Sequence, residues 1–162
     1  MKRSNWAGWL TGVVTCVGVT VAVQAGAPVH AVHLRPTEFE WQKLQPELKD
    51  RSAEMAILFV DPKTRGMQVM MRVPKNFHMP NHWLTANEMR TLIQGTYFAE
   101  CDGKLTRMEP GSWHLIPSKM PHQDWTSPTE GALILITVDS EWDFNWVGQV
   151  PRAEDFVGGR TS

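Results

Sequence analysis

The sequence predicts an all-β domain, and three observations support this prediction. From Val32 onward, short apolar or alternating runs follow one another, as is typical of strands. Turn-forming pairs such as Asp61-Pro62, Asp102-Gly103 and Pro110-Gly111 separate these runs. Long runs with helical periodicity are nearly absent. This pattern fits a sandwich, a jelly roll or a small barrel.

The first 31 residues are expected to be a signal peptide. Lys2 and Arg3 form a positive amino-terminal region, and an uncharged stretch follows as far as Arg35. Small residues suited to cleavage stand at Ala25, Ala27 and Ala31. The alternatives are an uncleaved membrane anchor, which several glycines disfavour, and lipidation at Cys16. Export predicts a periplasmic or secreted protein that leaves the membrane after cleavage.

Charge and cysteine content narrow the function classes. The chain has 16 Lys plus Arg and 17 Asp plus Glu, and this near balance argues against nucleic-acid binding. Cleavage after Ala31 would leave 131 residues with 14 basic and 17 acidic side chains, which suits one acidic domain. Cys101 would be the remaining cysteine, so stability must come from packing rather than from an internal disulfide.

The segments of the mature chain can be predicted in order. We expect an arm over 32–50, a barrel over 51–150 and a flexible tail over 151–162, where Gly158-Gly159 interrupts a stretch without periodicity. The arm has room for a helical turn or two, limited by Pro46. Apolar or alternating composition predicts strands at 56–60, 66–73, 89–98, 112–116, 132–138 and 142–147. In the last of these, strict alternation places three aromatic rings on one face.

Histidine and carboxylate spacing points to a site inside this domain. His82 and Glu88 are separated by five residues, Glu88 and Gly95 by six, and His122 follows a proline-rich turn. The second segment runs Pro110-Gly111, five residues, Pro117, and then a loop to His122. The sequence has no Gly-rich phosphate loop, no Gly-x-Ser-x-Gly elbow and no Cys-x-x-Cys pair. Their absence argues against phosphate transfer, a serine esterase and a zinc ribbon, respectively.

These residues resemble the two motifs of the cupin superfamily. The first family motif is His-x-His, three or four residues, Glu, six residues, Gly, and the second is Pro-Gly, five residues, Pro, a loop and His. The resemblance covers most of the mature domain. It is greatest to small exported bacterial single-domain cupins with an acidic, Trp-containing arm, here 38–42, and an Asp-Pro turn after the first strand.

The resemblance implies a double-stranded β-helix, or jelly-roll barrel, with one divalent metal ion inside. Leu84 stands where the family has its second histidine, so the implied ligands are reduced to His82, Glu88 and His122. Two histidines and one carboxylate suit non-haem Fe(II), and Zn, Mn or Ni are alternatives.

A metal-free interpretation stays open at this point. Arg90 points to the same side as Glu88 by two-residue alternation, so the two could form an ion pair without any metal. His78 could replace the missing ligand, although Pro80 disturbs the alternation between it and His82.

Several other residues could contribute to the site. Gln123 and Asp124 could orient the ring of His122. Trp113, Met120 and Trp125 could line an apolar pocket, and His114 reads as a core histidine.

The predicted function is an exported cupin that binds a small organic ligand beside a divalent metal. An enzyme of this kind would be an oxygenase, isomerase or decarboxylase, and a homodimer is compatible with the resemblance. The alternatives are a ligand-binding or sensing module without turnover, and a degenerate cupin without metal.

Overall fold

The computed structural model describes residues 30–161. The expected signal peptide therefore lies almost wholly outside the described residues. Among these residues, no helix has the length and apolar composition needed to cross a membrane.

Eleven strands and three short 3-10 helices make up the described chain. The strands are β1 (Gln42–Lys43), β2 (Glu54–Val60), β3 (Met67–Val73), β4 (His78–Trp83), β5 (Glu88–Gly95), β6 (Tyr97–Cys101), β7 (Lys104–Met108), β8 (Trp113–Ile116), β9 (His122–Thr126), β10 (Ala132–Val138) and β11 (Asn145–Trp146). The 3-10 helices are η1 (Pro36–Glu38), η2 (Pro46–Arg51) and η3 (Ala153–Phe156). The predicted all-β class is confirmed.

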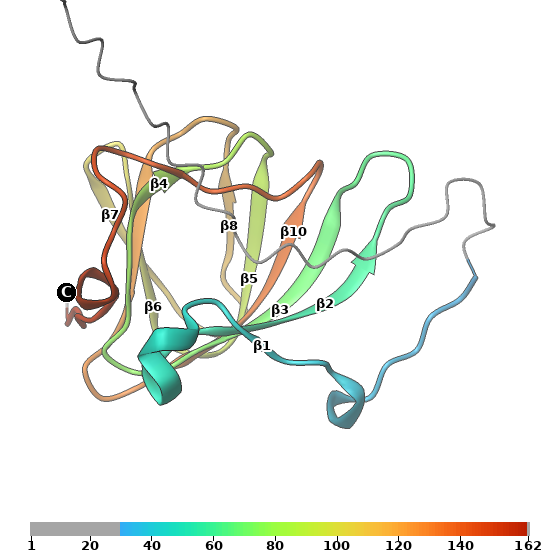
Figure 1. The fold of residues 1–162 in the computed structure, drawn as a ribbon, viewed down its shortest axis with the longest axis horizontal. Coiled ribbons are helices and arrows are strands. Elements are labelled where there is room, and N and C mark those ends of the chain that lie inside the picture. The colour runs from blue at the N-terminus through green and yellow to red at the C-terminus, as the bar shows by residue number, and fades with distance from the viewer. Residues whose placement is uncertain (1–29, 162) are drawn as a thin grey trace, which may run out of the picture.

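The strands form two antiparallel sheets that face each other (Figure 1). The six-stranded sheet has the order β1-β2-β3-β10-β5-β8, and the five-stranded sheet has the order β11-β4-β9-β6-β7. Several neighbouring strands are distant in sequence, such as β3 and β10 in the first sheet and β4 and β9 in the second, as in a jelly roll. The predicted jelly-roll barrel is therefore confirmed, with its interior between the two sheets.

Strand alternation determines which side chains face this interior. On β10, Ala132, Ile134, Ile136 and Val138 are buried, and the residues between them are partly exposed. These side chains join the apolar core with residues of β3 and with Phe77. Burial of one face of each strand supplies the main stabilisation of a two-layer β fold.

The predicted strand at 89–98 is two strands, because the chain changes sheet between β5 and β6 at Gly95. Gly95 has φ +88°, and a Cβ there would lie 1.9 Å from the carbonyl oxygen of Gly131. Only glycine tolerates this left-handed conformation and this close approach. Strands β1, β4, β7 and β9 were not predicted.

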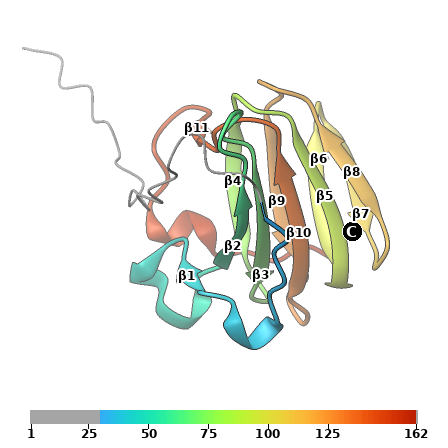
Figure 2. The same cartoon turned by 90° about the vertical axis from the view of Figure 1, so that its right-hand side faces the viewer.

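The arm lies against the β2 side of the molecule, away from β7 and β8 (Figure 2). Its β1 pairs antiparallel with β2, and Leu48 of η2 is buried in the core. Pro46 occupies the first turn of η2, where its missing N–H costs nothing. It therefore begins a helical segment instead of limiting one.

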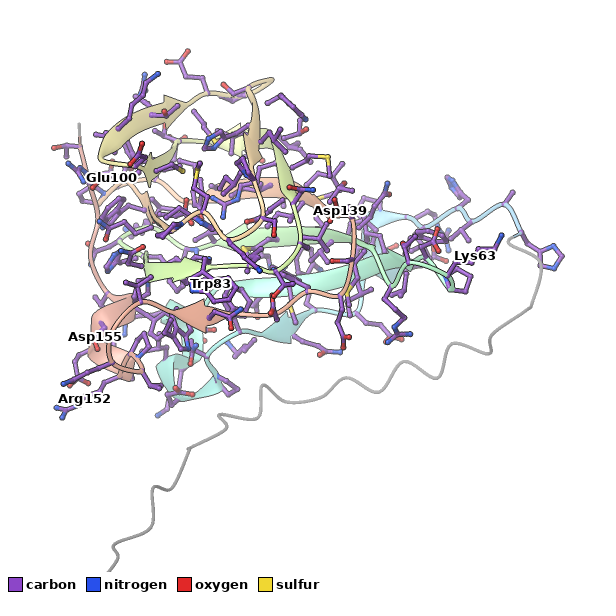
Figure 3. All side chains as sticks on the ribbon, turned by 90° about the horizontal axis from the view of Figure 1, so that it is seen from above. Lys63, Trp83, Glu100, Asp139, Arg152 and Asp155 are labelled. Atoms are coloured by element: carbon purple, nitrogen blue, oxygen red, sulfur yellow. The ribbon has the colours of Figure 1, made fainter. Side chains whose placement is uncertain are left out.

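The expectation of a flexible tail over 151–162 needs correction at its beginning. Phe156 of η3 is 2% exposed and contacts the rings of Phe77 and Trp146. Val157 forms an isolated β-bridge with Phe77. One aromatic side chain thus attaches this segment to the core. The periodicity of apolar residues in the sequence does not identify such a single contact. Figure 3 shows Arg152 and Asp155 of this segment at the opposite end of the molecule from Lys63 in the β2–β3 turn.

Candidate metal centre

The two sheets bring five ionisable side chains together inside the barrel. They are His82 from β4, Glu88 and Arg90 from β5, and His122 and Asp124 from β9. Each is at most 4% exposed. This set is called the charged cluster below.

Strand geometry explains why these side chains point inward. On β9 the buried positions alternate with Gln123 and Trp125, so His122 and Asp124 share the inner face. On β5 the same alternation places Glu88 and Arg90 inside.

The register of β4 against β9 shifts between Met79 and His82, which changes the alternation around Pro80. Met79 and His82 are both buried as a result, whereas His78 is only partly buried. His78 contacts the backbone oxygen of Asp155 at 2.8 Å and stacks on Trp125. It lies outside the charged cluster and does not replace a missing ligand.

Backbone contacts fix the ring orientation of both inner histidines. Nδ1 of His82 lies 2.8 Å from the carbonyl oxygen of Pro80, and Nδ1 of His122 lies 3.0 Å from that of Met120. A carbonyl oxygen only accepts, so Nδ1 of each ring donates. The remaining nitrogen, Nε2, then presents its lone pair when the ring is neutral, which is the arrangement of a metal-binding histidine.

Both inner histidines are neutral in this arrangement. Burial lowers the pKa of His82 to about 4. Nε2 of His122 lies 3.1 Å from Nη2 of Arg90, and a guanidinium nitrogen can only donate. His122 therefore accepts through Nε2 and donates through Nδ1.

Arg90 bridges the two carboxylates of the cluster. Its Nη2 donates to Oε2 of Glu88 at 2.9 Å, and its Nη1 donates to Oδ1 of Asp124 at 2.5 Å. Burial alone would raise the pKa of Glu88, but the charge of Arg90 holds it well below its ordinary value. The two carboxylates hold the pKa of Arg90 well above its ordinary value despite its burial. The expected Glu88–Arg90 ion pair is present.

The charged cluster has an excess of negative charge. With neutral histidines, two carboxylates face one guanidinium, which leaves one negative charge uncompensated. Oδ2 of Asp124 is buried and has no hydrogen-bond partner among the described residues. A buried carboxylate oxygen without a partner is costly, and a cation beside it would remove that cost.

His82, His122 and Asp124 can hold a metal ion. One donor atom of each lies within 4.8 Å of the donors of the other two, and all three side chains are buried. Imidazole nitrogen and carboxylate oxygen are ligands for Fe, Mn, Zn and Ni. The unpartnered oxygen of Asp124 fits this group, because a bound cation would satisfy it.

Two of the three predicted ligands, His82 and His122, belong to this group, and the third, Glu88, lies next to it. Oε2 of Glu88 is 3.6 Å from Nε2 of His122 and is engaged by Arg90. Asp124 was predicted only to orient His122. The position of Asp124 two residues after His122 on a strand was the signal that could have placed it in this group.

The other residues considered near the predicted site, and Leu84 in the first motif, lie outside this group. Leu84 is 3% exposed and packs in the apolar core. Trp113 is 64% exposed, Trp125 stacks on His78, and Met120 lines a surface hollow with Asn81 and Gln123. The prediction of one apolar pocket lined by these three side chains was therefore wrong, because Trp113 is exposed and the other two contact different residues.

An aromatic segment covers the cluster on the His82 side. The ring centroids of Phe144 and Trp146 lie 5.1 Å and 5.7 Å from that of His82. Trp142 packs next to Phe144 at 5.4 Å, so the three rings form one group, although only Asn145–Trp146 is a strand. The predicted placement of these rings on one side is confirmed.

Comparison with known proteins gave matches among solved structures alone. No family model and no curated protein matches this sequence. The polyketide cyclase RemF from Streptomyces resistomycificus superposes with a TM-score of 0.63 at 18% identity, covering 75% of this chain and 88% of RemF. KdgF from Halomonas sp. gives 0.57 at 17% identity, covering 68% of this chain and 94% of KdgF.

A cupin-2 domain protein from Rhodospirillum rubrum gives a TM-score of 0.59 at 19% identity, over 80% of this chain and 85% of that protein. Identities of this size establish a shared fold and leave activity open. The sheet order and the structural matches together show that the described chain has the cupin fold.

Proposed function

We propose that this protein is an exported cupin that binds one divalent metal ion in its barrel and a small organic ligand beside it. The metal ligands in this proposal are His82, His122 and Asp124, and the ion is Fe, Mn, Zn or Ni. The observation that carries the proposal is the unpartnered Oδ2 of Asp124, buried next to two imidazoles that present Nε2 inward.

Charge and tautomer both support cation binding. The cluster carries a net negative charge inside an apolar barrel, where a cation is attracted more strongly than in water. The histidines hold the required tautomer through the carbonyls of Pro80 and Met120, so binding needs no ring flip. The two imidazole rings are therefore oriented for an ion before the ion arrives.

This metal would supply Lewis-acid chemistry, or oxygen binding if it is iron. The residues of this chain have separate tasks in the proposal. Asp124 supplies negative charge, Glu88 holds Arg90, and the rings of Phe144 and Trp146 exclude water on the His82 side. RemF, which shares this fold, is described as a polyketide cyclase, and the proposal includes an enzyme that acts on an oxygenated organic molecule. Oxygenase, isomerase and decarboxylase activities are the candidates.

One observation favours a second function, namely ligand binding or sensing without turnover. Leu84 occupies the position of a histidine in the cupin motif and is buried in the apolar core. A three-residue site binds a metal less firmly than a four-residue site, and the loss harms an enzyme more than a binding protein. Turnover assays on the metal-loaded protein separate the two functions.

Metal analysis of the untagged protein tests the proposal. We expect about one divalent ion per chain after equilibration with excess Mn(II) or Zn(II). His82→Gln and Asp124→Asn should abolish this uptake. His78→Gln is the matched control, because His78 lies on the same strand outside the cluster, and it should retain the ion. Absence of uptake by the wild-type protein would refute the proposal.

The export component has its own test. Mass spectrometry of the protein from a producing cell should find a chain that begins between Gly26 and Val32. An intact Met1 in a membrane fraction would show that the segment is an anchor.

A further inference from the structure

We propose that Arg90 competes with the metal ion for His122, so that metal affinity is set by a cation built into the barrel. This inference rests on the proposed function and deepens it. Arg90 would determine how tightly the site binds metal without being a ligand itself.

The contested atom is Nε2 of His122. It has one lone pair, and Nη2 of Arg90 donates to it at 3.1 Å. A metal bond to the same lone pair is about 2.1 Å long, which leaves no space for Nη2 at its present position. Arg90 and a metal ion therefore cannot both use His122.

Asp124 is shared in a different way. Its Oδ1 accepts from Nη1 of Arg90, whereas its Oδ2 has no partner among the described residues. One oxygen can serve the guanidinium while the other serves an ion. At Asp124 Arg90 and the metal ion would use different oxygen atoms. They would interfere only through charge, because a dication and a guanidinium on the same carboxylate repel each other.

Glu88 opposes the departure of Arg90. Its Oε2 binds Nη2, the same nitrogen that donates to His122, and both side chains are buried. Moving this nitrogen away from His122 strains or breaks the contact with Glu88. The Glu88–Arg90 pair thus keeps the guanidinium over His122 and lowers the affinity for metal.

Replacement of the pair by apolar residues tests the inference. The double variant Glu88→Leu/Arg90→Leu removes one charge of each sign, so the net charge of the cluster is unchanged. His82, His122 and Asp124 remain. We expect Zn(II) and Mn(II), titrated alone, to bind this variant about tenfold more tightly than the wild-type protein, or more.

A surface pair provides the matched control. Arg107 and Glu109 form an ion pair with the same two-residue spacing, and both side chains are more than half exposed. The double variant Arg107→Leu/Glu109→Leu should bind both ions as the wild-type protein does.

A second variant is needed in case the first does not fold. Arg90→Lys keeps a positive charge for the two carboxylates but lacks the planar fork that reaches three acceptors together. It should release His122 and also tighten binding.

The outcomes separate the inference from the proposed function. If Glu88→Leu/Arg90→Leu and Arg90→Lys bind the metal ions with the same affinity as the wild-type protein, Arg90 does not compete for His122, although the metal site itself is retained. Loss of binding in the Glu88→Leu/Arg90→Leu protein, with retention in Arg90→Lys, would show that Glu88 is a ligand and would also overturn it. Absence of uptake by every protein would refute the metal site itself.

Discussion

The interior of this barrel has two halves that are equally buried but differ in the chemistry of their side chains. One half is apolar and is formed by β3, β10 and the docked η3, with Ile134, Ile136 and Phe156 at most 3% exposed. The other half, formed by β4, β5 and β9, is the charged cluster, whose members are at most 4% exposed. Equal burial of such different side chains indicates that the two halves serve different purposes.

The two kinds of buried side chain contribute differently to the free energy of folding. Apolar burial stabilises the fold in proportion to the area removed from water. A buried ion pair, by comparison, is often no more stabilising than apolar residues of similar volume. Stability therefore does not explain why the second half is charged, and binding explains it better.

The largest effect is expected for Arg90→Leu alone. This substitution leaves Glu88 and Asp124 buried without their shared cation, which should lower the free energy of unfolding by about 3–5 kcal/mol in metal-free buffer. Urea denaturation measures it. Arg107→Leu, in an exposed pair, should cost about 1 kcal/mol or less. A small effect for Arg90→Leu would show that the charged half does not depend on its internal pairing.

Phe156→Ala probes the apolar half. Removing the buried ring from its contacts with Phe77 and Trp146 should lower the free energy of unfolding by about 3 kcal/mol. Val150→Ala, at a side chain 52% exposed in the same carboxy-terminal region, should change it by less than about 0.5 kcal/mol. Similar values for both would mean that the tail does not belong to the core.

Acid should weaken the charged half first. The pKa of His82 is about 4 in the folded protein and 6.5 as an ordinary value, so the unfolded chain takes up the proton at higher pH. We consider the metal-free protein in buffer that contains a chelator. There the contribution of neutral His82 to the free energy of unfolding is fully present above pH 6.5 and is lost as the pH falls through about 4. Its slope in this window is at most about 1.4 kcal/mol per pH unit.

Urea denaturation at several pH values, compared with the His82→Phe variant, isolates this contribution. The difference between the two proteins should change across the window. A constant difference would contradict the prediction. The low pKa of Glu88 acts in the same direction, but only below its ordinary value of 4.5.

The smallest effect concerns reactivity rather than stability. Burial raises the pKa of the Cys101 thiol to about 11, so little thiolate is present at pH 8. Alkylation by iodoacetamide should therefore keep accelerating well above pH 9 in the folded protein. In urea the same reaction should level off near the ordinary thiol pKa. Identical profiles would show that folding does not suppress this thiol.

Sequence patterns predicted the apolar half well and the charged half only in part. Strands such as β3 and β10 carry apolar side chains on their inner face, and this composition identifies them. β9 was missed because its buried positions are His122, Asp124 and Thr126, which look like loop residues. β4 was missed because Pro80 interrupts it.

The resemblance to cupin motifs identified His82, Glu88 and His122, and the structure brings them together. The pairing of Arg90 with Glu88 was expected from their alternation on β5, whereas the pairing of Arg90 with Asp124 depends on how β5 and β9 face each other across the two sheets. That relationship is not encoded by spacing within either strand. Phe156 shows the same limit, because a lone aromatic side chain in a Gly-rich stretch has no pattern until the fold places Phe77 beside it.

A crystal structure of the protein soaked in Mn(II), with an anomalous difference map, tests the central claim most directly. The account predicts one anomalous peak bonded to Nε2 of His82, Nε2 of His122 and Oδ2 of Asp124, with Nη2 of Arg90 displaced from His122. A peak bonded to Glu88 with Arg90 in place, or no peak in the cluster at a saturating Mn(II) concentration, would contradict it.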